Sequence, residues 1–327
     1  MGKRRIRNLQ ALGITNIVGF DKRDDRCALA TEQYNIVAKT NVNELFAEYT
    51  FDAFIISLPP DMHHIYMKMA VDKNIASFIE ASVLDTDFEE IIMQAKNANV
   101  CLAPSCTLYF HPAIKEIQRI INNNELGKIS NFLYHSGQYL PDWHTYEDVS
   151  EYYVSNKETG GGREIVPFEL TWITMLLGLP KRVVGFFKNS IDIVGAEDID
   201  DTYNLLMDYG NYIFNLSVDV VSRYATRRLV INGDKKQLYW SWDENLIKLY
   251  EPEKNEWIER KYETISAQTG YNKNITEQMY VDEMDAFLKA KNGEQAFPNT
   301  LERDYEALKL LYAVEESDRK NQIKIVQ

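Results

Sequence analysis

The first hundred residues alternate between short apolar runs and segments with helical periodicity. Residues 51–57, with the sequence FDAFIIS, show the near-continuous apolar pattern of a strand buried on both faces of a parallel sheet. A helix with Asp61 as its N-cap follows, and its apolar residues recur three and four positions apart. Repeated alternation of this kind predicts an α/β fold with a doubly wound parallel sheet. The expected strands are 17–21, 51–57, 76–80 and 100–103, and the expected helices are 3–12, 24–34, 42–48, 61–72 and 88–97.

The pattern changes after Pro112, where a helix with an isoleucine stripe begins that Gly127 ends. Beyond residue 129 strands dominate, and Asn232-Gly233 has the residue types of a hairpin turn. This part is predicted to be an α+β domain with a large, mostly antiparallel open sheet. We divide the chain into domains 1–104 and 105–327, and leave open whether the last helix packs back on the first domain. The expected strands are 129–138, 181–190, 202–209, 212–222, 227–232, 236–242 and 245–251, and the expected helices are 112–127, 166–177, 273–290 and 300–315.

Composition narrows the class of protein. Hydrophobic residues make up 45% of the 327 residues, which is enough for two folded cores. The net charge of −13 argues against a nucleic-acid partner, since such a protein needs a basic face. No apolar run approaches the ~20 residues of a membrane span, and no apolar stretch of a signal peptide follows the N-terminus. Cys27, Cys101 and Cys106 lack metal-ligand spacing, so we expect a cytoplasmic protein with reduced thiols and no metal.

The N-terminal segment has the order of the second half of a dinucleotide-binding βαβ unit. A helix opened by Gly2 leads into a short apolar strand that ends at the acidic Asp21. Gly2 would be the third glycine of the fingerprint, and the first strand with its Gly-x-Gly turn would precede it. That missing strand would lie between the strands that end at Asp21 and Ser57. We therefore expect this chain to bind a nicotinamide cofactor weakly or not at all, unless the start codon is mis-set.

Several motifs, in order, resemble the Gfo/Idh/MocA oxidoreductases, the glucose-fructose oxidoreductase and inositol dehydrogenase group. The segment 57–63 resembles a strand-end Thr-Pro-x-x-x-His motif, and 110–113 resembles an Arg-Phe-x-Pro helix start with a Leu-Gly-x-Ile exit at 126–129. Gly160-Gly161-Gly162 resembles the glycines that precede the catalytic helix, and 139–143 resembles members of bacterial surface-sugar and nonulosonic acid pathways.

The resemblance covers the chain from Gly2 onward and implies four properties. These are a Rossmann-type first domain, an open-sheet second domain, NAD(P)-linked redox chemistry on a sugar or nucleotide sugar, and homodimers or homotetramers formed through the sheet. The alternating apolar residues of strands 227–251 also favour self-association. The residues concerned are Leu229, Ile231, Leu238, Trp240, Trp242 and Leu249.

Two motifs depart from the family pattern. The Glu-Lys-Pro motif is replaced by Glu80-Ala81-Ser82, and Ala81 cannot donate a hydrogen bond or titrate. The Asp-x-x-x-His of the catalytic helix is replaced by residues 166–170, VPFEL, which contain no histidine. Two interpretations therefore stay open. The chain is either an NAD(P)-dependent sugar oxidoreductase in surface-glycan biosynthesis, or a non-catalytic relative that binds a sugar or nucleotide or serves as a subunit.

The expected cofactor residues lie at the N-terminus and at the strand ends. Asp21 would accept from the adenosine ribose and favour NAD, although Arg23 could tolerate the 2′-phosphate of NADP. His63 could equally be a capping residue, and Glu80 ends a buried strand at the edge where ligands bind. The full set is Gly2, Lys3, Arg4, Asp21, Arg23, Ser57, Leu58, Pro59, Pro60, His63, Glu80 and Ala81.

The expected catalytic residues are Glu164 and Glu169, the titratable groups near the missing histidine. Glu169 would lie in the first turn of a helix with Pro167 at N1, where the helix dipole also explains an acidic residue. Arg163 would anchor an anionic group, and Trp143 would stack on a sugar ring. The expected substrate-binding residues are Tyr109, His111, Trp143, His144 and Arg163.

Overall fold

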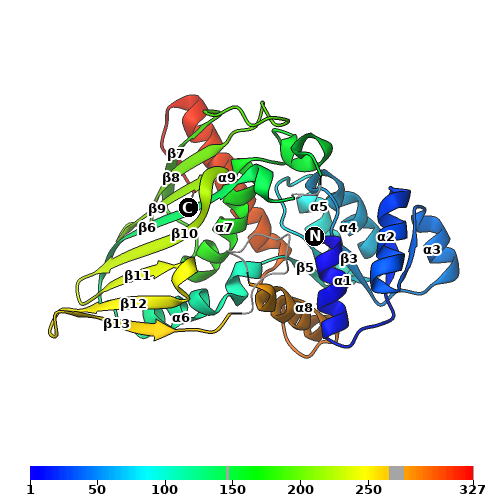
Figure 1. Cartoon of the computed structure of the whole chain (residues 1–327), viewed down its shortest axis with the longest axis horizontal. Coiled ribbons are helices and arrows are strands. Elements are labelled where there is room, and N and C mark those ends of the chain that lie inside the picture. Colours follow the sequence, from blue (N-terminus) through cyan, green and yellow to red (C-terminus); the bar gives the residue numbers. More distant parts are fainter. Residues whose placement is uncertain (145–146, 265–275, 327) are drawn as a thin grey trace. The chain divides into compact units, whose positions relative to one another are not determined.

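The computed structural model describes residues 1–144, 147–264 and 276–326 and divides them into two units (Figure 1). The first unit contains Met1–Glu80, Thr86–Ser105 and Tyr280–Leu301. The second contains Ala81–Asp85, Cys106–Met279 and Glu302–Gln327. The division therefore differs from one at residue 104, because a late segment of the chain belongs to the first unit.

The first unit is built from alternating strands and helices, as the apolar pattern predicts. Its described strands pair only in parallel. The expected helix 273–290 begins at Glu277, and residues 273–275 lie outside the described residues. Its helices are α1 (Gly2–Ala11), α2 (Asp24–Tyr34), α3 (Val42–Glu48), α4 (His63–Asp72), α5 (Phe88–Ala98) and most of α8 (Glu277–Lys291). Its strands are β1 (Val18–Phe20), β2 (Val37–Lys39), β3 (Ala53–Ile56), β4 (Ala76–Ile79) and β5 (Leu102–Pro104).

The parallel strands form two separate sheets, β1-β2 and β3-β4-β5. Among the described residues no strand pairs with both β1 and β3. The space between these two strands is the position predicted for the missing strand. All three residues of β1 and the first three of β3 remain half-buried, whereas β5 is buried throughout. The fold class is confirmed, with the parallel sheet split at the predicted position.

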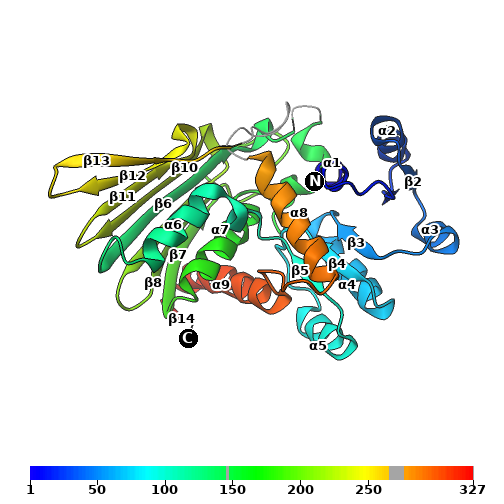
Figure 2. The same ribbon diagram turned by 90° about the horizontal axis from the view of Figure 1, so that it is seen from below.

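The second unit is built on one nine-stranded sheet in the order β13-β12-β11-β10-β6-β9-β8-β7-β14. Only the β6–β9 pair is parallel. Helices α6, α7 and α9 cover one face, and no described helix of the unit lies over the other (Figure 2). The helices are α6 (Pro112–Asn122), α7 (Gly162–Leu177) and α9 (Leu301–Lys320). The strands are β6 (Ile129–Tyr139), β7 (Arg182–Lys188), β8 (Thr202–Asp208), β9 (Ile213–Asp219), β10 (Val221–Gly233), β11 (Gln237–Ser241), β12 (Leu246–Glu251), β13 (Glu256–Lys261) and β14 (Lys324–Ile325).

The apolar residues of β10–β12 do not form an exposed surface, which corrects the observation that favoured self-association. Leu229, Ile231, Leu238, Trp240 and Leu249 are each at most 1% exposed, because they face the helix-covered side of the sheet. Trp242 is half-buried, and its indole N–H donates to the Ala225 carbonyl.

Several helix boundaries differ from the prediction, and α9 runs five residues past its expected end, to Lys320. Helix α4 begins at His63 after a 3₁₀ turn, and Asp61 does not cap it. Helix α7 begins at Gly162, so Pro167 lies inside the helix rather than at N1. Helix α6 ends at Asn122, before Gly127. In the described parts of the chain, no helix is long and apolar enough to cross a membrane.

Candidate active site

Three polar residues directly follow the strands of the β3-β4-β5 sheet. They are Ser57, Glu80 and Ser105, and they share one edge because the strands are parallel. Ligands bind at this edge in open α/β sheets. The Ser57 hydroxyl donates to Glu80 at 3.2 Å, and the Ser105 hydroxyl donates to Glu283 of α8 at 3.0 Å.

The Arg5 guanidinium joins the two carboxylates. Its Nε and Nη2 donate to the two oxygens of Glu80 at 2.7 and 3.1 Å, and Nη2 lies 2.8 Å from Glu283 Oε2. Burial alone would raise the pKa of Glu80, but the Arg5 charge outweighs it and holds that pKa below its usual range. Glu80, predicted as a cofactor ligand, therefore anchors α1 to the sheet. No local pattern in the sequence indicates the role of Arg5, because its partners lie 75 and 278 residues further along the chain.

The start of α1 presents open space. A Cβ on Gly2 would meet no atom within 4 Å, so no described strand packs against this glycine. The first amides of a helix have no partner within the helix and favour anions. Lys3 is half-buried here, whereas Arg4 is buried with its guanidinium 4.2 Å from the centre of the Tyr280 ring.

Asp21 follows β1 with its side chain 33% exposed. One carboxylate oxygen accepts from the Arg23 backbone N–H at 2.9 Å. The Arg23 guanidinium pairs with Asp25 at 2.6 Å. The Asp21 carboxylate is therefore within reach of a ligand, while the Arg23 side chain is directed to another acid.

The loop after β3 is held by His63. Its buried Nε2 donates to the Leu58 carbonyl at 2.9 Å, and burial lowers the pKa of the imidazole, so the ring is neutral. Pro59 and Pro60 lead into the 3₁₀ turn between them. His63 thus shapes the loop, which agrees with the structural alternative left open for it.

Glu169 is fully buried beneath the nine-stranded sheet. Its carboxylate accepts from Tyr134 at 2.9 Å, Ser136 at 2.7 Å and the Trp172 indole at 2.8 Å. The Arg227 Nε donates to it at 3.1 Å. Four donors saturate both oxygens, and the residue lies in the second turn of α7 rather than the first. The structure therefore favours a structural role for Glu169 over the predicted catalytic one.

Arg163 and His111 are also occupied by the fold. Arg163 is 6% exposed, and its guanidinium pairs with Glu315 at 2.7 Å and donates to the Val83 carbonyl at 3.2 Å. His111 Nδ1 accepts from the Ala113 N–H and caps α6. The Arg163 guanidinium is therefore engaged within the fold, and His111 is 3% exposed. Tyr109 is half-buried, with its ring edge-on to a neighbouring phenylalanine. Ala81 is half-buried and leaves the position of the motif lysine apolar.

Of the two predicted catalytic residues, Glu164 is the one whose carboxylate keeps an unsatisfied oxygen. Tyr153 donates to its Oε1 at 2.6 Å, while its Oε2 is buried with no partner among the described residues. Burial raises the pKa of Glu164 to about 7, against the opposing effect of the Tyr153 hydrogen bond. A carboxyl group with this pKa can exchange a proton near neutral pH.

The structure connects Glu164 to two other predicted residues through a pair of tyrosines. Tyr153 meets Tyr152 edge-on at 6.1 Å, and Tyr152 stacks on the His144 ring at 4.6 Å. The adjacent Trp143 has a buried indole N–H with no hydrogen-bond partner among the described residues. We call Trp143, His144, Tyr152, Tyr153 and Glu164 the tyrosine–glutamate cluster. Sequence reasoning missed both tyrosines, although both lie just before the glycines at 160–162.

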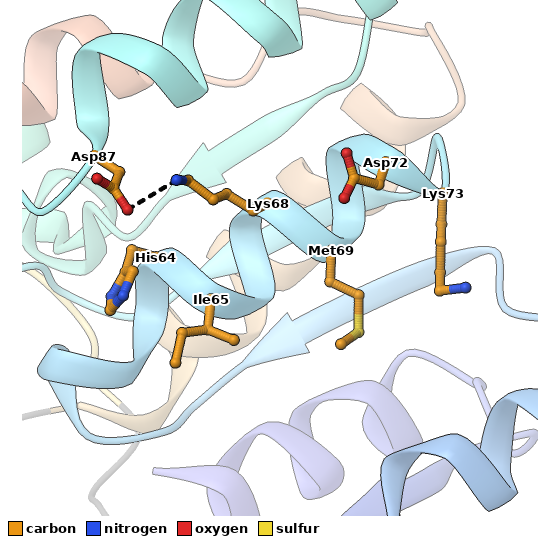
Figure 3. A pocket seen from close by; sticks show the side chains of 7 residues that line it. All are labelled: His64, Ile65, Lys68, Met69, Asp72, Lys73 and Asp87. Atoms are coloured by element: carbon orange, nitrogen blue, oxygen red, sulfur yellow. Dashed lines mark ion pairs between the residues drawn. The ribbon is translucent and has the colours of Figure 1, made fainter.

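A hollow of about 620 Å³ lies along the outward side of α4 (Figure 3). His64, Ile65, Lys68, Met69, Asp72, Lys73 and Asp87 line it. The Lys68 ammonium lies 2.9 Å from Asp87 Oδ2 and 2.9 Å from Glu90 Oε2, so carboxylates of the protein already neutralise its charge. None of the predicted site residues contributes to this hollow.

These two units define the class of protein. The first has parallel strands with Asp21 at a strand end, as in dinucleotide-binding units, and the second is an α+β unit with a nine-stranded open sheet. Residues 114–239 match the sequence model of the GFO/IDH/MocA C-terminal domain. Over these residues the resemblance to the Gfo/Idh/MocA oxidoreductases is confirmed, and the whole chain shares its fold with solved oxidoreductases. No curated protein sequence matches this chain.

Solved structures show the same fold at low sequence identity. A levoglucosan dehydrogenase in complex with NADH and levoglucosan has a TM-score of 0.84 and 14% identity, over 100% of this chain and 96% of that chain. A probable dehydrogenase from Thermotoga maritima has a TM-score of 0.79 and 17% identity, over 99% and 96%. An oxidoreductase from Agrobacterium radiobacter, in complex with NAD+, L-tartaric acid and magnesium, has a TM-score of 0.81 and 13% identity, over 99% and 94%.

Proposed function

We propose that this chain is an NAD-linked oxidoreductase that acts on a sugar hydroxyl or keto carbon, with Glu164 as the proton-transferring catalytic residue. The observation that carries the proposal is the buried, unpartnered Oε2 of Glu164. The pKa of about 7 supports it, because an acid–base group works best near the operating pH. Structures of similar fold hold NADH with levoglucosan, or NAD+ with L-tartaric acid.

The residues of the first unit fit a dinucleotide in two respects. The partly exposed Asp21 carboxylate suits the adenosine ribose hydroxyls, and a side chain at Gly2 would meet no atom within 4 Å, which leaves room for a phosphate beside the start of α1. The described residues lack the glycine turn that would cradle the rest of the pyrophosphate. A bound nicotinamide would supply the two-electron acceptor, and the protein's own task is to hold the sugar and take up its proton.

The tyrosine–glutamate cluster is the proposed sugar site. The Trp143 N–H can donate to a sugar oxygen, and Glu164 Oε2 can accept from a sugar hydroxyl. The aromatic rings suit the apolar face of a sugar ring. Since Arg163 is engaged by Glu315, we propose that this site contacts the sugar ring rather than the phosphates of a nucleotide sugar. A place in surface-glycan biosynthesis rests on the resemblance of residues 139–143.

The replacement of the motif lysine by Ala81 favours a second candidate, a non-catalytic subunit that binds a sugar. One experiment separates the two. The full chain is incubated with NAD+ or NADP+ and a panel of free sugars, cyclitols and nucleotide sugars, and formation of reduced nicotinamide is measured. With enough dinucleotide to offset the weak binding expected of this chain, we expect turnover with a free sugar and at least about 100-fold loss in Glu164→Gln. Glu158→Gln, which changes an exposed acid nearby, should be unaffected. Sugar binding without turnover would support the subunit instead.

A further inference from the structure

Tyr153 and Glu164 are held in a fixed relation by the loop between them. Tyr153 opens a short 3₁₀ turn, Tyr153–Ser155, and Glu164 lies in the first turn of α7. Thr159 Oγ1 donates to the Tyr153 carbonyl at 2.9 Å, and the Gly160 N–H donates to the Asn156 carbonyl at 2.8 Å. The loop turns so tightly that a Cβ on Gly160 would lie 1.9 Å from the Val154 carbonyl oxygen.

The two carboxylate oxygens of Glu164 consequently have different environments. Oε1 accepts the Tyr153 hydroxyl at 2.6 Å, a short charge-assisted hydrogen bond. Oε2 is buried and has no partner in the described structure. A free carboxylate can rotate and present either oxygen, whereas the Tyr153 bond restricts that rotation. A hydroxyl that enters the cluster therefore meets one defined acceptor atom.

We propose that Tyr153 is the positioning residue for Glu164, holding Oε1 so that Oε2 alone exchanges the proton with the substrate. This inference rests on the proposed function of Glu164. As the alcohol is oxidised, its O–H bond breaks and an Oε2–H bond forms. A bound nicotinamide would be the two-electron acceptor for the hydride, which leaves the same carbon with its electron pair. In the reverse direction Oε2 returns the proton to the nascent alkoxide.

Other charged groups on this loop and helix do not compete for Glu164. The Arg163 guanidinium is bound to Glu315, and Lys157 lies 3.8 Å from Asp200. The Glu158 side chain is exposed. Among the described residues of the second unit, Tyr153 is thus the side chain that donates to this carboxylate.

The test compares Tyr153→Phe, which removes only the hydroxyl, with Tyr250→Phe, which removes a phenol hydroxyl bonded to Asn255 elsewhere in the same unit. The protein is labelled with glutamate carrying ¹³C at Cδ, and the Glu164 signal is identified by its loss in Glu164→Gln. We expect Tyr153→Phe to raise the titration midpoint of this signal by about one pH unit, because the hydrogen bond stabilises the charged form. Tyr250→Phe should leave it in place.

The kinetic arm uses the best sugar from the substrate panel with NAD+. Tyr153→Phe should lower kcat about tenfold and move the inflection of the pH profile upward, with KM little changed, as expected for a lost hydrogen bond to a charged group. A parallel fall in stability and kcat with an unmoved inflection would show a merely structural tyrosine and overturn the inference. An unmoved ¹³C midpoint would overturn it without any substrate. Absence of turnover with a shifted midpoint would instead count against the proposed function alone.

Discussion

The Arg227 guanidinium lies 3.1 Å from the Glu169 carboxylate, with both side chains at most 1% exposed. Glu169 belongs to α7 and Arg227 to β10, so the pair ties the helix to the sheet beneath it. Tyr134 and Ser136 of β6 complete the attachment. Glu169, which the sequence predicted to be catalytic, thus anchors α7 to the sheet in the core of the second unit.

Removal of this anchor should destabilise the protein strongly. Glu169→Ala leaves the Arg227 charge buried without its partner, which typically costs about 3–5 kcal/mol. Urea unfolding followed by circular dichroism would measure the loss. Glu158→Gln, an exposed change, should stay within roughly 0.5 kcal/mol of the unmodified protein. A Glu169→Ala variant of unchanged stability would show that the ion pair contributes nothing.

Glu164 should make stability fall as the pH rises. Its pKa is about 7 in the folded protein against 4.5 for the free side chain, so the folded state binds more protons between these values. The free energy of unfolding therefore decreases as the pH rises through this window and stays reduced above it. Glu164→Gln removes the penalty and should add about 3 kcal/mol at pH 8, with little change at pH 4. An identical pH dependence of the melting temperature in both proteins would contradict the assignment.

Asp21 should set the cofactor preference. Its carboxylate would repel the 2′-phosphate of NADP, although Arg26 lies 3.9 Å from that carboxylate and Arg23 pairs with the exposed Asp25. We predict a preference for NAD, which Asp21→Ala should relax by about tenfold or more in the ratio of the two dissociation constants. Calorimetric titration with both dinucleotides, on the chain extended before Met1 by the predicted strand, would measure the ratio. Tighter NADP binding by the unmodified protein would refute the assignment of Asp21.

The gap between β1 and β3 should limit cofactor binding. The residues of β1 and most of β3 are half-buried, and each backbone group that is buried without a partner would cost roughly 1–3 kcal/mol, against a total domain stability of ~5–15 kcal/mol. We expect weak NAD(H) binding by this 327-residue chain. A version extended before Met1 by an apolar strand with a Gly-x-Gly turn should bind at least about tenfold more tightly and melt at a higher temperature. Equal micromolar affinity of the two would show that Gly2 is not part of a fingerprint.

The uncovered face of the nine-stranded sheet should mediate self-association. Leu133 and Leu206 are each 47% exposed on this face, and both pair in register with Asn215, one from each side. We predict a homodimer or homotetramer, and monomers for the variant with both leucines changed to lysine. Light scattering would decide. A clean monomer of the unmodified chain at micromolar concentration would reject the prediction. Leu229→Lys is not a suitable variant for this test, because Leu229 is buried and a lysine there would unfold the core.

The sequence predicted the elements whose apolar pattern is continuous or strictly periodic. The sequence analysis did not predict the edge strands β2, β13 and β14, because they are short or charged. Exposed sheet edges are commonly of this kind. Helix α7 was placed too late, because Pro167 has the residue type of an N1 position while the helix already begins at Gly162.

The candidate site was predictable only in part. Glu164 was found from its spacing to the glycines, but the two carboxylates could not be ranked, because burial and partners decide between them. Tyr153 and Arg5 act through partners that spacing does not reveal. Arg5 in particular bonds to Glu80 and Glu283, and no local pattern connects these positions.

Glu283 has a consequence for how the protein is made. Arg5 and Glu80 leave the ribosome long before α8 is synthesised, by roughly 10–40 s at 5–20 residues per second. Until then the Arg5 guanidinium lacks one of its two carboxylates, and the Phe78 ring lacks Phe287 and Phe297, which pack against it in the finished fold. During translation the first unit therefore begins to emerge first but is among the last parts to be completed. Until α8 is made, we expect it to stay partly folded, with apolar surface that chaperones can bind.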